Sequence, residues 1–377
     1  MTTPILVVGT GVASVAPARF PAALARAGAT VSLLVPANAQ ARHTRHVVRV
    51  GLVPPGAPTS RWTEALFALV DAAAPRAIVP ADAGALDFLT ALVLAPPPTL
   101  RPERVAQLAP RLEDALGSQE GWPARIDPHS AVDLLARANV RTPESRLVAT
   151  AAEAEASAHA LGGAVVVRAP TPRGPRALAS AATAQAAFAR VTASSPNDPR
   201  ALVERRVAGA SYTHHVAAHR GRVVASATAE HVVVEDGAGR RPTVLRFCVH
   251  DDIALRAERA VAALGAGGCC ALDFVVGTDG EAWLVDVDRH VVPTAHVSRW
   301  LGVDLAGAWL AALEGRPPAG ATTLPAGTSR FSVAFPQEWR RDSGSRWLRD
   351  ERVDVPWDDP DLLEAILDDA AVARHGR

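Results

Sequence analysis

Apolar and polar residues follow a repeating pattern over the first part of the chain. Up to residue 94, short apolar runs alternate with longer segments in which apolar residues recur at helical spacing. This pattern predicts strands at 5–9, 31–35 and 77–80 and helices at 16–27, 60–73 and 82–94. Strands that alternate with helices form parallel sheets, so we expect a doubly wound, Rossmann-like first domain.

The pattern changes twice further along the chain. Prolines at 96–98 and a loop-rich stretch up to Pro128 mark the first change. The next region predicts strands at 146–148 and 164–168 and helices at 130–138, 151–161 and 181–191. After Pro199, the pattern predicts strands at 201–207, 211–218, 222–230, 270–276 and 282–288 and helices at 253–264, 294–300 and 304–314.

We therefore expect a multidomain chain of mixed α/β and α+β class. Its expected segments are a Rossmann-like domain at 1–125, a small subdomain at 126–200, a larger subdomain at 201–316 and an extension of unknown role at 317–377. A length of 377 residues agrees with this division, because one hydrophobic core seldom serves so long a chain.

Composition narrows the classes of function. The 39 basic residues balance 39 acidic ones, so no overall charge favours nucleic acid or an anionic membrane as a partner. All 39 basic residues are arginine, and the chain has no lysine. This excludes the usual forms of pyridoxal-phosphate enzymes, Schiff-base aldolases, Walker-A NTPases and protein kinases, which all need a lysine.

Cysteine usage and hydropathy favour a cytoplasmic protein. Cys248, Cys269 and Cys270 have no C-x-x-C spacing and are too few for a disulfide framework in a chain of this size. The first residues lack the pattern of a signal peptide, and no run of 18 apolar residues occurs. We expect no membrane partner.

The segment 270–288 predicts a β-hairpin. Asp279-Gly280 at its centre is a strong signal for a two-residue turn, which would pair Thr278 with Glu281. In this register, one face of the hairpin is apolar and is expected in the core. Its residues are Leu272, Phe274, Val276, Trp283, Val285 and Val287.

The other face of the hairpin carries three carboxylates. The same register puts Asp273 opposite Asp286, with Asp288 two residues along on the same face. Directly opposed like charges are destabilising, so a cation is expected between them. Oxygen ligands favour Mg²⁺ or Mn²⁺, and the alternative is a solvated acidic face neutralised by nearby arginines.

With these residues in view, the chain resembles the ATP-grasp superfamily from its start to about Gly315. Asp273 and the pair Asp286-x-Asp288 stand where that family has the acidic residues and asparagine that bind the magnesium of the nucleotide. The resemblance implies a Rossmann-like N-terminal domain followed by an ATP-grasp fold, with ATP and Mg²⁺ (or Mn²⁺) as cofactors.

Three upstream segments carry the rest of the resemblance. The strand ending at Arg168 resembles the one whose terminal lysine contacts the α- and β-phosphates, with arginine substituted. The loop 171–176 resembles the flexible loop over the phosphates, which makes Arg173 and Arg176 candidate phosphate contacts. The segment 203–209 resembles the adenine hinge, where Glu204 would lie nearest the adenine amino group and the backbone near Val207 would meet the ring edge.

The chain departs from the family pattern at several positions besides Arg168. Pro128 stands where a first phosphate-binding lysine is expected, and Ser211 where an acidic ribose ligand is expected. His290 replaces an arginine, although the adjacent Arg289 is a further candidate donor to phosphate. These departures leave open whether the site turns over.

The resemblance implies an ATP-dependent ligase that joins a carboxylate to an amine or a thiol through an acylphosphate. One alternative is a degenerate relative that binds nucleotide or metabolite without turnover. Another, a dinucleotide or nucleotide-sugar enzyme using the glycines at 9–11, is disfavoured because no acidic residue follows the strand at 31–35. The expected partners are small carboxylates and amines; their identity and the oligomeric state, including a homodimer, stay open.

Overall fold

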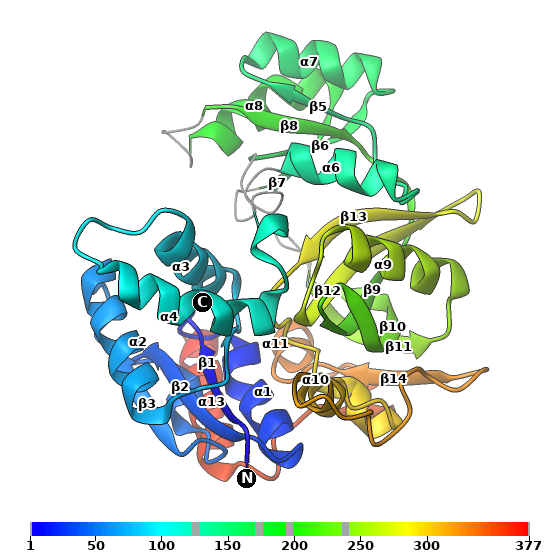
Figure 1. Ribbon diagram of the computed structural model, residues 1–377. Helices are drawn as coiled ribbons and strands as arrows, with labels where there is room; N and C mark the ends of the chain where they lie inside the picture. Colours follow the sequence, from blue (N-terminus) through cyan, green and yellow to red (C-terminus); the bar gives the residue numbers. More distant parts are fainter. Residues whose placement is uncertain (1, 123–127, 170–175, 194–198, 236–240, 376–377) are drawn as a thin grey trace.

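The computed structural model describes residues 2–122, 128–169, 176–193, 199–235 and 241–375, arranged around three β-sheets (Figure 1). The first sheet has the parallel order β3-β2-β1-β4. Its strands are β1 (Pro4–Val8), β2 (Thr30–Pro36), β3 (Arg49–Val53) and β4 (Ala77–Pro80). The helices of this domain are α1 (Val15–Arg26), η1 (Gln40–His43), α2 (Thr59–Ala73), α3 (Ala83–Leu94), α4 (Pro102–Leu116) and η2 (Gln119–Gly121).

The predicted Rossmann-like first domain is confirmed, and β3 and α4 are its longest elements that the pattern did not predict. β3 is an edge strand, and its mostly exposed side chains give no buried apolar run. α4 lies in the stretch that was expected to be loop-rich. The pattern did not predict this helix because it begins at Pro102 and contains Pro110. Its buried leucines Leu108, Leu112 and Leu116 recur every four residues, and α4 packs against β4.

The second sheet is antiparallel, with the order β5-β8-β6-β7. Its strands are β5 (Ser145–Val148), β6 (Ala164–Arg168), β7 (Arg176–Ser180) and β8 (Ala201–Arg205). The helices of this region are α6 (Pro128–Arg137), α7 (Ala151–Ala160), η3 (Ala181–Thr183) and α8 (Ala184–Thr192). β8 pairs with β5 and β6, so this sheet extends past the expected boundary at residue 200.

The third sheet has seven strands in the order β13-β12-β9-β10-β11-β14-β15. They are β9 (Gly209–His219), β10 (Arg222–Val234), β11 (Pro242–Cys248), β12 (Gly268–Gly277), β13 (Ala282–Asp288), β14 (Ser329–Val333) and β15 (Arg352–Val353). The helices of this region are α9 (Asp251–Ala263), η4 (Val297–Leu301), α10 (Leu305–Leu313), α11 (Gln337–Arg341), α12 (Trp347–Asp350) and α13 (Pro360–His375). No helix of the described ranges is both long and apolar enough to cross a membrane.

The two faces of the seven-stranded sheet pack on different helices. One face contributes Val216, Leu272 and Phe274 to a core shared with α9. On the other face, small residues such as Ala217 and Ala271 pack on α10, which also contacts α1. α10 therefore packs between the seven-stranded sheet and the first domain. This packing positions β12, and with it the paired strand β13, relative to the first domain.

The C-terminal extension is part of the same fold. β14 and β15 complete the seven-stranded sheet, and α13 returns to the first domain, where it packs on η1 (Figure 1). Arg19 Nη2 lies 2.7 Å from Asp354 Oδ1, and the Thr44 hydroxyl donates to Asp359 Oδ2 at 2.6 Å. These contacts tie the end of the chain to its beginning.

Candidate active site

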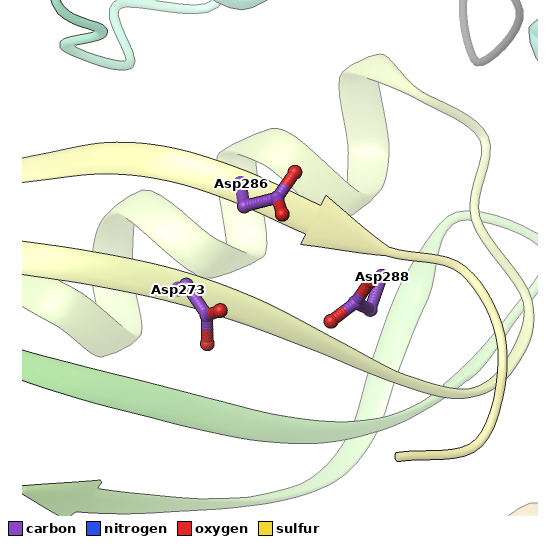
Figure 2. Close-up of side chains that lie close together, drawn as sticks. All are labelled: Asp273, Asp286 and Asp288. Carbon is purple, nitrogen blue, oxygen red and sulfur yellow. The ribbon is translucent and has the colours of Figure 1, made fainter. Parts of the chain in front are cut away.

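Three aspartate side chains lie together near the end of β13 (Figure 2). Asp273 of β12 is opposite Asp286 of β13 in the strand register, and Asp288 follows on β13. One carboxylate oxygen of each residue lies within 4.8 Å of the others, and the three side chains are half-buried. The structure brings these residues together as the sequence predicted, and an all-oxygen donor set fits Mg²⁺ or Mn²⁺. Their role as metal ligands stays a prediction.

The turn of this hairpin differs from the predicted one. Gly277, and not Thr278, is linked to Glu281: the Gly277 N–H donates to the Glu281 carbonyl at 2.9 Å. Gly280 has a left-handed φ of +79°, and its N–H donates to the Gly277 carbonyl at 3.0 Å. The turn is therefore a three-residue loop that ends on a glycine, and it shifts the register next to it by one residue.

A β-bulge restores the predicted register before the aspartates. Phe274 pairs with Leu284, whereas the adjacent Asp273 pairs with Asp286, so Val285 is the extra residue on β13. The loop and the bulge offset each other. The pairing of Asp273 with Asp286 is thus correct, although the predicted two-residue turn is wrong.

The bulge also changes which side chains of β13 face the core. Ala282 and Leu284 are buried, whereas the predicted core residues Trp283 and Val285 are half-buried. The guanidinium of Arg141 lies 5.8 Å from the centre of the Trp283 ring. Trp283 and Val285 were expected in the core because the alternation was continued without a bulge.

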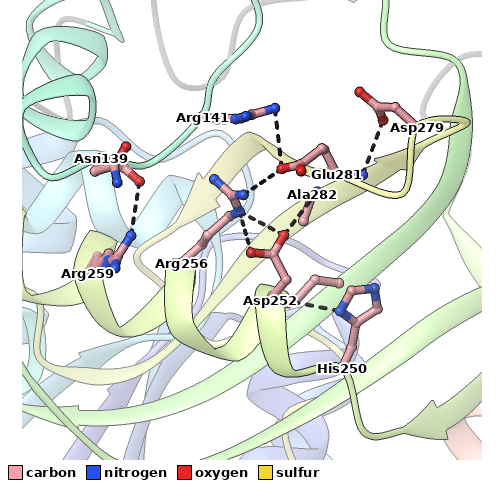
Figure 3. A network of polar contacts seen from close by, with 10 residues as sticks. Asn139, Arg141, His250, Asp252, Arg256, Arg259, Asp279, Glu281 and Ala282 are labelled. Carbon is pink, nitrogen blue, oxygen red and sulfur yellow. Dashed lines mark hydrogen bonds and ion pairs between the residues drawn. The ribbon is translucent and has the colours of Figure 1, made fainter.

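Ion pairs hold the hairpin against α9 (Figure 3). Arg256 of α9 lies 2.8 Å from Asp252 and 2.9 Å from Glu281, which Arg141 also approaches at 3.3 Å. The Ala282 N–H donates to Asp252 at 3.2 Å. Burial raises the pKa of Asp252, but the hydrogen bonds from Arg256 and from the Ala282 N–H, together with the charge of Arg256, keep this pKa below its usual value. The turn end of the hairpin is therefore held by ion pairs from α9 and from Arg141.

Arg168 and Glu204, both predicted to contact the nucleotide, form an ion pair. Arg168 Nη2 donates to Glu204 Oε1 at 2.9 Å, and Nε lies 2.8 Å from Oε2. Each side chain is 12% exposed. A guanidinium has five N–H donors, so a pair with Glu204 leaves Arg168 donors for a second anionic group.

The remaining predicted nucleotide residues are only partly described. Arg173 lies outside the described residues, and Arg176 begins β7, where its backbone pairs with that of Arg168. Val207 follows β8 and is half-buried. The glycine that ends the predicted hinge, Gly209, starts β9; a Cβ there would lie 1.9 Å from the carbonyl oxygen of Val276, so this close approach requires glycine.

Three of the positions that depart from the expected motifs, Pro128, Ser211 and His290, lie in different surroundings. Pro128 is the first residue of α6, a position that suits proline because a helix leaves that N–H unpaired. Ser211 is exposed on β9. His290 Nδ1 lies 3.8 Å from Asp288 Oδ1, next to the aspartate cluster.

Arg289 is buried and binds main-chain carbonyls. Its Nη1 donates to Gly121 and its Nη2 to Leu116, each at 2.7 Å, and the residue is 3% exposed. Burial lowers the pKa of Arg289 to about 10. Arg289 therefore joins the end of β13 to the end of α4, and the suggestion that it donates to phosphate is not supported.

Two cavities adjoin the aspartate cluster. A small one of about 100 Å³ lies between α3, α6, the second sheet and β13, and its wall includes Arg168, Glu204 and Asp286. A larger one of about 740 Å³ lies between the first domain and the seven-stranded sheet, with Asp273 in its wall. Asp288 and His290 line both cavities.

Asp82, which the sequence analysis did not single out, fills the glycine-rich turn after β1. Its Oδ2 accepts from the N–H groups of Thr10 and Gly11 at 2.7 and 2.9 Å, and its Oδ1 accepts from the Thr10 hydroxyl at 2.9 Å. Asp82 also caps α3 through the Ala85 N–H at 2.8 Å. In dinucleotide-binding proteins such a turn approaches the pyrophosphate. Here its amides bind a carboxylate of the chain itself, which counts against a dinucleotide site.

Thr213 and His231 also line the larger cavity, and the sequence analysis missed both. The Thr213 hydroxyl donates to Asp273 Oδ1 at 2.7 Å, and His231 Nε2 lies 2.8 Å from the same hydroxyl oxygen. Burial lowers the pKa of His231 to about 4. Once β9 is known to pair with β12, the alternation of side chains along each strand places Thr213 on the same face as Asp273. The order of the strands is needed first, and the sequence does not give it.

No protein-family model matches the sequence, and no curated protein matches it either. Solved structures resemble its fold. A biotin carboxylase from Campylobacter jejuni aligns over 82% of this chain and 71% of its own, with a TM-score of 0.63 and 13% identity. An N5-carboxyaminoimidazole synthase from Aspergillus clavatus aligns over 86% and 80%, with a TM-score of 0.63 and 16% identity.

An L-amino acid ligase from Bacillus licheniformis aligns over 83% of this chain and 74% of its own, with a TM-score of 0.58 and 14% identity. Each alignment covers most of both chains, so the likeness extends beyond a single domain. At such low identity the likeness concerns the fold. The chain has the ATP-grasp fold that its motifs predicted.

Proposed function

We propose that this protein is an ATP- and Mg²⁺-dependent ligase that joins a carboxylate to an amine or a thiol. The observation that carries the proposal is the small cavity, because its wall combines Arg168 and Glu204 with Asp286 and Asp288. These residues come from segments far apart in the sequence, and each was expected at a nucleotide site. The solved relatives agree: the Campylobacter biotin carboxylase was crystallised with an ATP ligand and a 2-oxoglutarate carboxylase domain with MgADP.

In the proposed reaction, an oxygen of the substrate carboxylate attacks the γ-phosphorus of ATP and ADP leaves, which forms an acylphosphate. The amine or thiol then attacks the acyl carbon, phosphate leaves and the nucleophile loses its proton. Such phosphoryl transfer depends on positioning and on charge neutralisation more than on a protein nucleophile. Bound Mg²⁺, or Mn²⁺, would supply most of that neutralisation.

The residues of this chain have distinct roles in the proposal. Asp273, Asp286 and Asp288 hold the metal ion. Arg168 donates to the phosphates while it remains beside Glu204, which lies nearest the adenine amino group. The predicted contacts of Arg173 and Arg176 with phosphate, and of the backbone near Val207 with adenine, belong to the same proposal.

The larger cavity is proposed to hold the carboxylate and amine substrates. Its volume of about 740 Å³ suits small molecules, and Asp273 and Asp288 in its wall adjoin the proposed metal site. The solved relatives bind small substrates: one structure contains bicarbonate and another 5-aminoimidazole ribonucleotide.

A second candidate function is nucleotide binding without turnover. The pairing of Arg168 with Glu204 favours it, because both oxygens of Glu204 are already engaged by the guanidinium. The exposed Ser211, which stands where an acidic ribose ligand is expected, also favours it.

Release of ADP by the purified protein tests the proposal against this alternative. The assay supplies Mg-ATP with a panel of amino acids and small carboxylates, and the Asp286→Asn/Asp288→Asn variant is the blank. A ligase releases ADP above the blank with at least one panel member. Tight binding of Mg-ATP without substrate-stimulated release would favour the binding protein.

A further inference from the structure

Four side chains lie in one transverse row across the seven-stranded sheet. Asp286 of β13 is opposite Asp273 of β12, which is opposite Thr213 of β9, and Thr213 is opposite Ala229 of β10. His231 lies two residues beyond Ala229 on the same strand and reaches Thr213 diagonally. The acidic end of this row is the proposed metal site.

The hydrogen bonds that link His231, Thr213 and Asp273 have a defined direction. An ionised carboxylate only accepts, so the single hydroxyl proton of Thr213 points to Asp273 Oδ1. The hydroxyl oxygen then acts as the acceptor for His231, whose Nε2 must carry the proton. His231 is therefore the Nε2–H tautomer, and burial, which lowers its pKa to about 4, keeps the ring neutral.

We propose that Thr213 and His231 are positioning residues for the metal site, which orient the Asp273 carboxylate toward the ion. The terminal torsion of an aspartate side chain is broad, so packing alone leaves the plane of the carboxylate loosely defined. The Thr213 hydroxyl occupies one lone pair of Oδ1 and fixes that plane, and His231 fixes the hydroxyl.

This inference rests on the metal site of the proposed function. Hydrogen-bonding partners of metal ligands typically account for 10- to 100-fold in metal affinity. Thr213 and His231 both line the larger cavity, so the same hydrogen bonds connect the wall of the proposed substrate cavity with a metal ligand. They are not catalytic residues, since they act through Asp273.

The test measures binding of Mn²⁺ by electron paramagnetic resonance, with and without a non-hydrolysable ATP analogue. Thr213→Val, which removes the hydroxyl and keeps the shape, is expected to weaken Mn²⁺ binding by about 10-fold or more. Thr213→Ser is expected to restore it. His231→Phe removes the donor to the Thr213 hydroxyl and is expected to weaken binding less than Thr213→Val.

The same sheet offers a matched control. Thr228 is buried, and its hydroxyl lies 2.8 Å from His214 Nδ1, so it is another threonine–histidine pair. Thr228→Val is expected to leave Mn²⁺ affinity unchanged. Equal weakening in Thr228→Val and Thr213→Val would overturn the inference, because it would report a general loss of packing.

The outcome for the unaltered protein separates the two proposals. If it binds Mn²⁺ and Thr213→Val binds equally well, the positioning role is wrong and the metal site stands. If it binds no Mn²⁺ with or without the nucleotide analogue, the metal site itself is wrong and the positioning role falls with it.

Discussion

Arg168 of β6 and Glu204 of β8 hold each other across neighbouring strands, with N–O distances of 2.9 and 2.8 Å. Both residues were predicted to contact ATP, and neither was predicted to contact the other. The pair lies in the wall of the small cavity, with Asp286 and Asp288 in the same wall. Arg168 is therefore oriented toward the proposed nucleotide site by a carboxylate that belongs to that site.

Replacement of Arg168 tests its role toward phosphate. We expect Arg168→Ala to weaken ATP binding by about 1.5–3 kcal/mol, the scale of a hydrogen bond to a charged group. Arg168→Lys should recover part of this loss. The measurement is calorimetric titration with Mg-ATP, and Arg205→Ala is the control, because Arg205 lies next to Glu204 on β8 but pairs with Glu144. Unchanged ATP affinity together with a lower melting temperature would make Arg168 a structural ion-pair partner only.

Charge removal at the aspartate cluster should separate folding from metal binding. In Asp286→Asn/Asp288→Asn the like charges are reduced, so we expect the metal-free protein to melt at the same temperature or slightly higher. The unaltered protein should gain stability on addition of Mg²⁺, and the variant should not. Asp279→Asn removes a charge from the turn of the same hairpin and should behave like the unaltered protein. Stabilisation of the double variant by Mg²⁺ would count against the cluster as ligands.

Two buried histidines predict a fall in stability at mildly acidic pH. Burial lowers the pKa of His214 to about 3 and that of His215 to about 4, from 6.5. Below pH 6.5 the unfolded chain takes up protons that the folded protein does not, so the free energy of unfolding decreases. The slope approaches about 1.4 kcal/mol per pH unit for each histidine until the pH nears the folded pKa.

Urea unfolding at pH 7.5, 6 and 5 measures this slope. We expect His214→Gln to flatten it, whereas His159→Gln, at an exposed position, should not. Slopes that agree in all three proteins would show that the buried histidines do not govern this pH dependence.

The C-terminal extension should stabilise the first domain through Asp354. This carboxylate lies 2.7 Å from Arg19 and 2.7 Å from His296, with 20% of its side chain exposed. Burial raises the pKa of Asp354, but the charge of His296 and that of Arg19 outweigh it, so the group stays ionised. We expect Asp354→Ala to cost about 3–5 kcal/mol in urea unfolding, because the largely buried Arg19 loses its counter-charge and His296 loses its hydrogen-bond partner.

A nearby pair on the surface provides the control for Asp354. Asp358 pairs with Arg26, but 44% of its side chain is exposed. Asp358→Ala should cost about 1 kcal/mol or less. A similar cost for the two variants would contradict the role of Asp354 as a buried tie between the ends of the chain.

The sequence predicted those parts of the fold that rest on local patterns. β1 and β2 are buried apolar runs, and helices α1, α2 and α3 were predicted from helical spacing between turn signals. The pairing of Asp273 with Asp286 was also correct. The two-residue turn from which this pairing was predicted was wrong. The actual turn has three residues, and the extra residue Val285, which the sequence does not mark as a bulge, restores the register.

The parts that escaped prediction depend on which strands are neighbours. Arg168 meets Glu204 because β6 lies beside β8, and Thr213 meets Asp273 because β9 lies beside β12. Neither adjacency follows from spacing along the chain. Asp82 escaped notice for a related reason: its role as a helix cap is local, whereas its contact with Thr10 depends on β4 lying beside β1.

The affinity for ATP with and without Mg²⁺ tests the central claim most directly. Calorimetric titration with a non-hydrolysable ATP analogue should reveal one site per chain whose affinity depends on Mg²⁺ in the unaltered protein. In Asp286→Asn/Asp288→Asn, with the fold verified by circular dichroism, that dependence on Mg²⁺ should disappear. Equal affinity in the two proteins, or no nucleotide binding by the unaltered protein, would contradict the account.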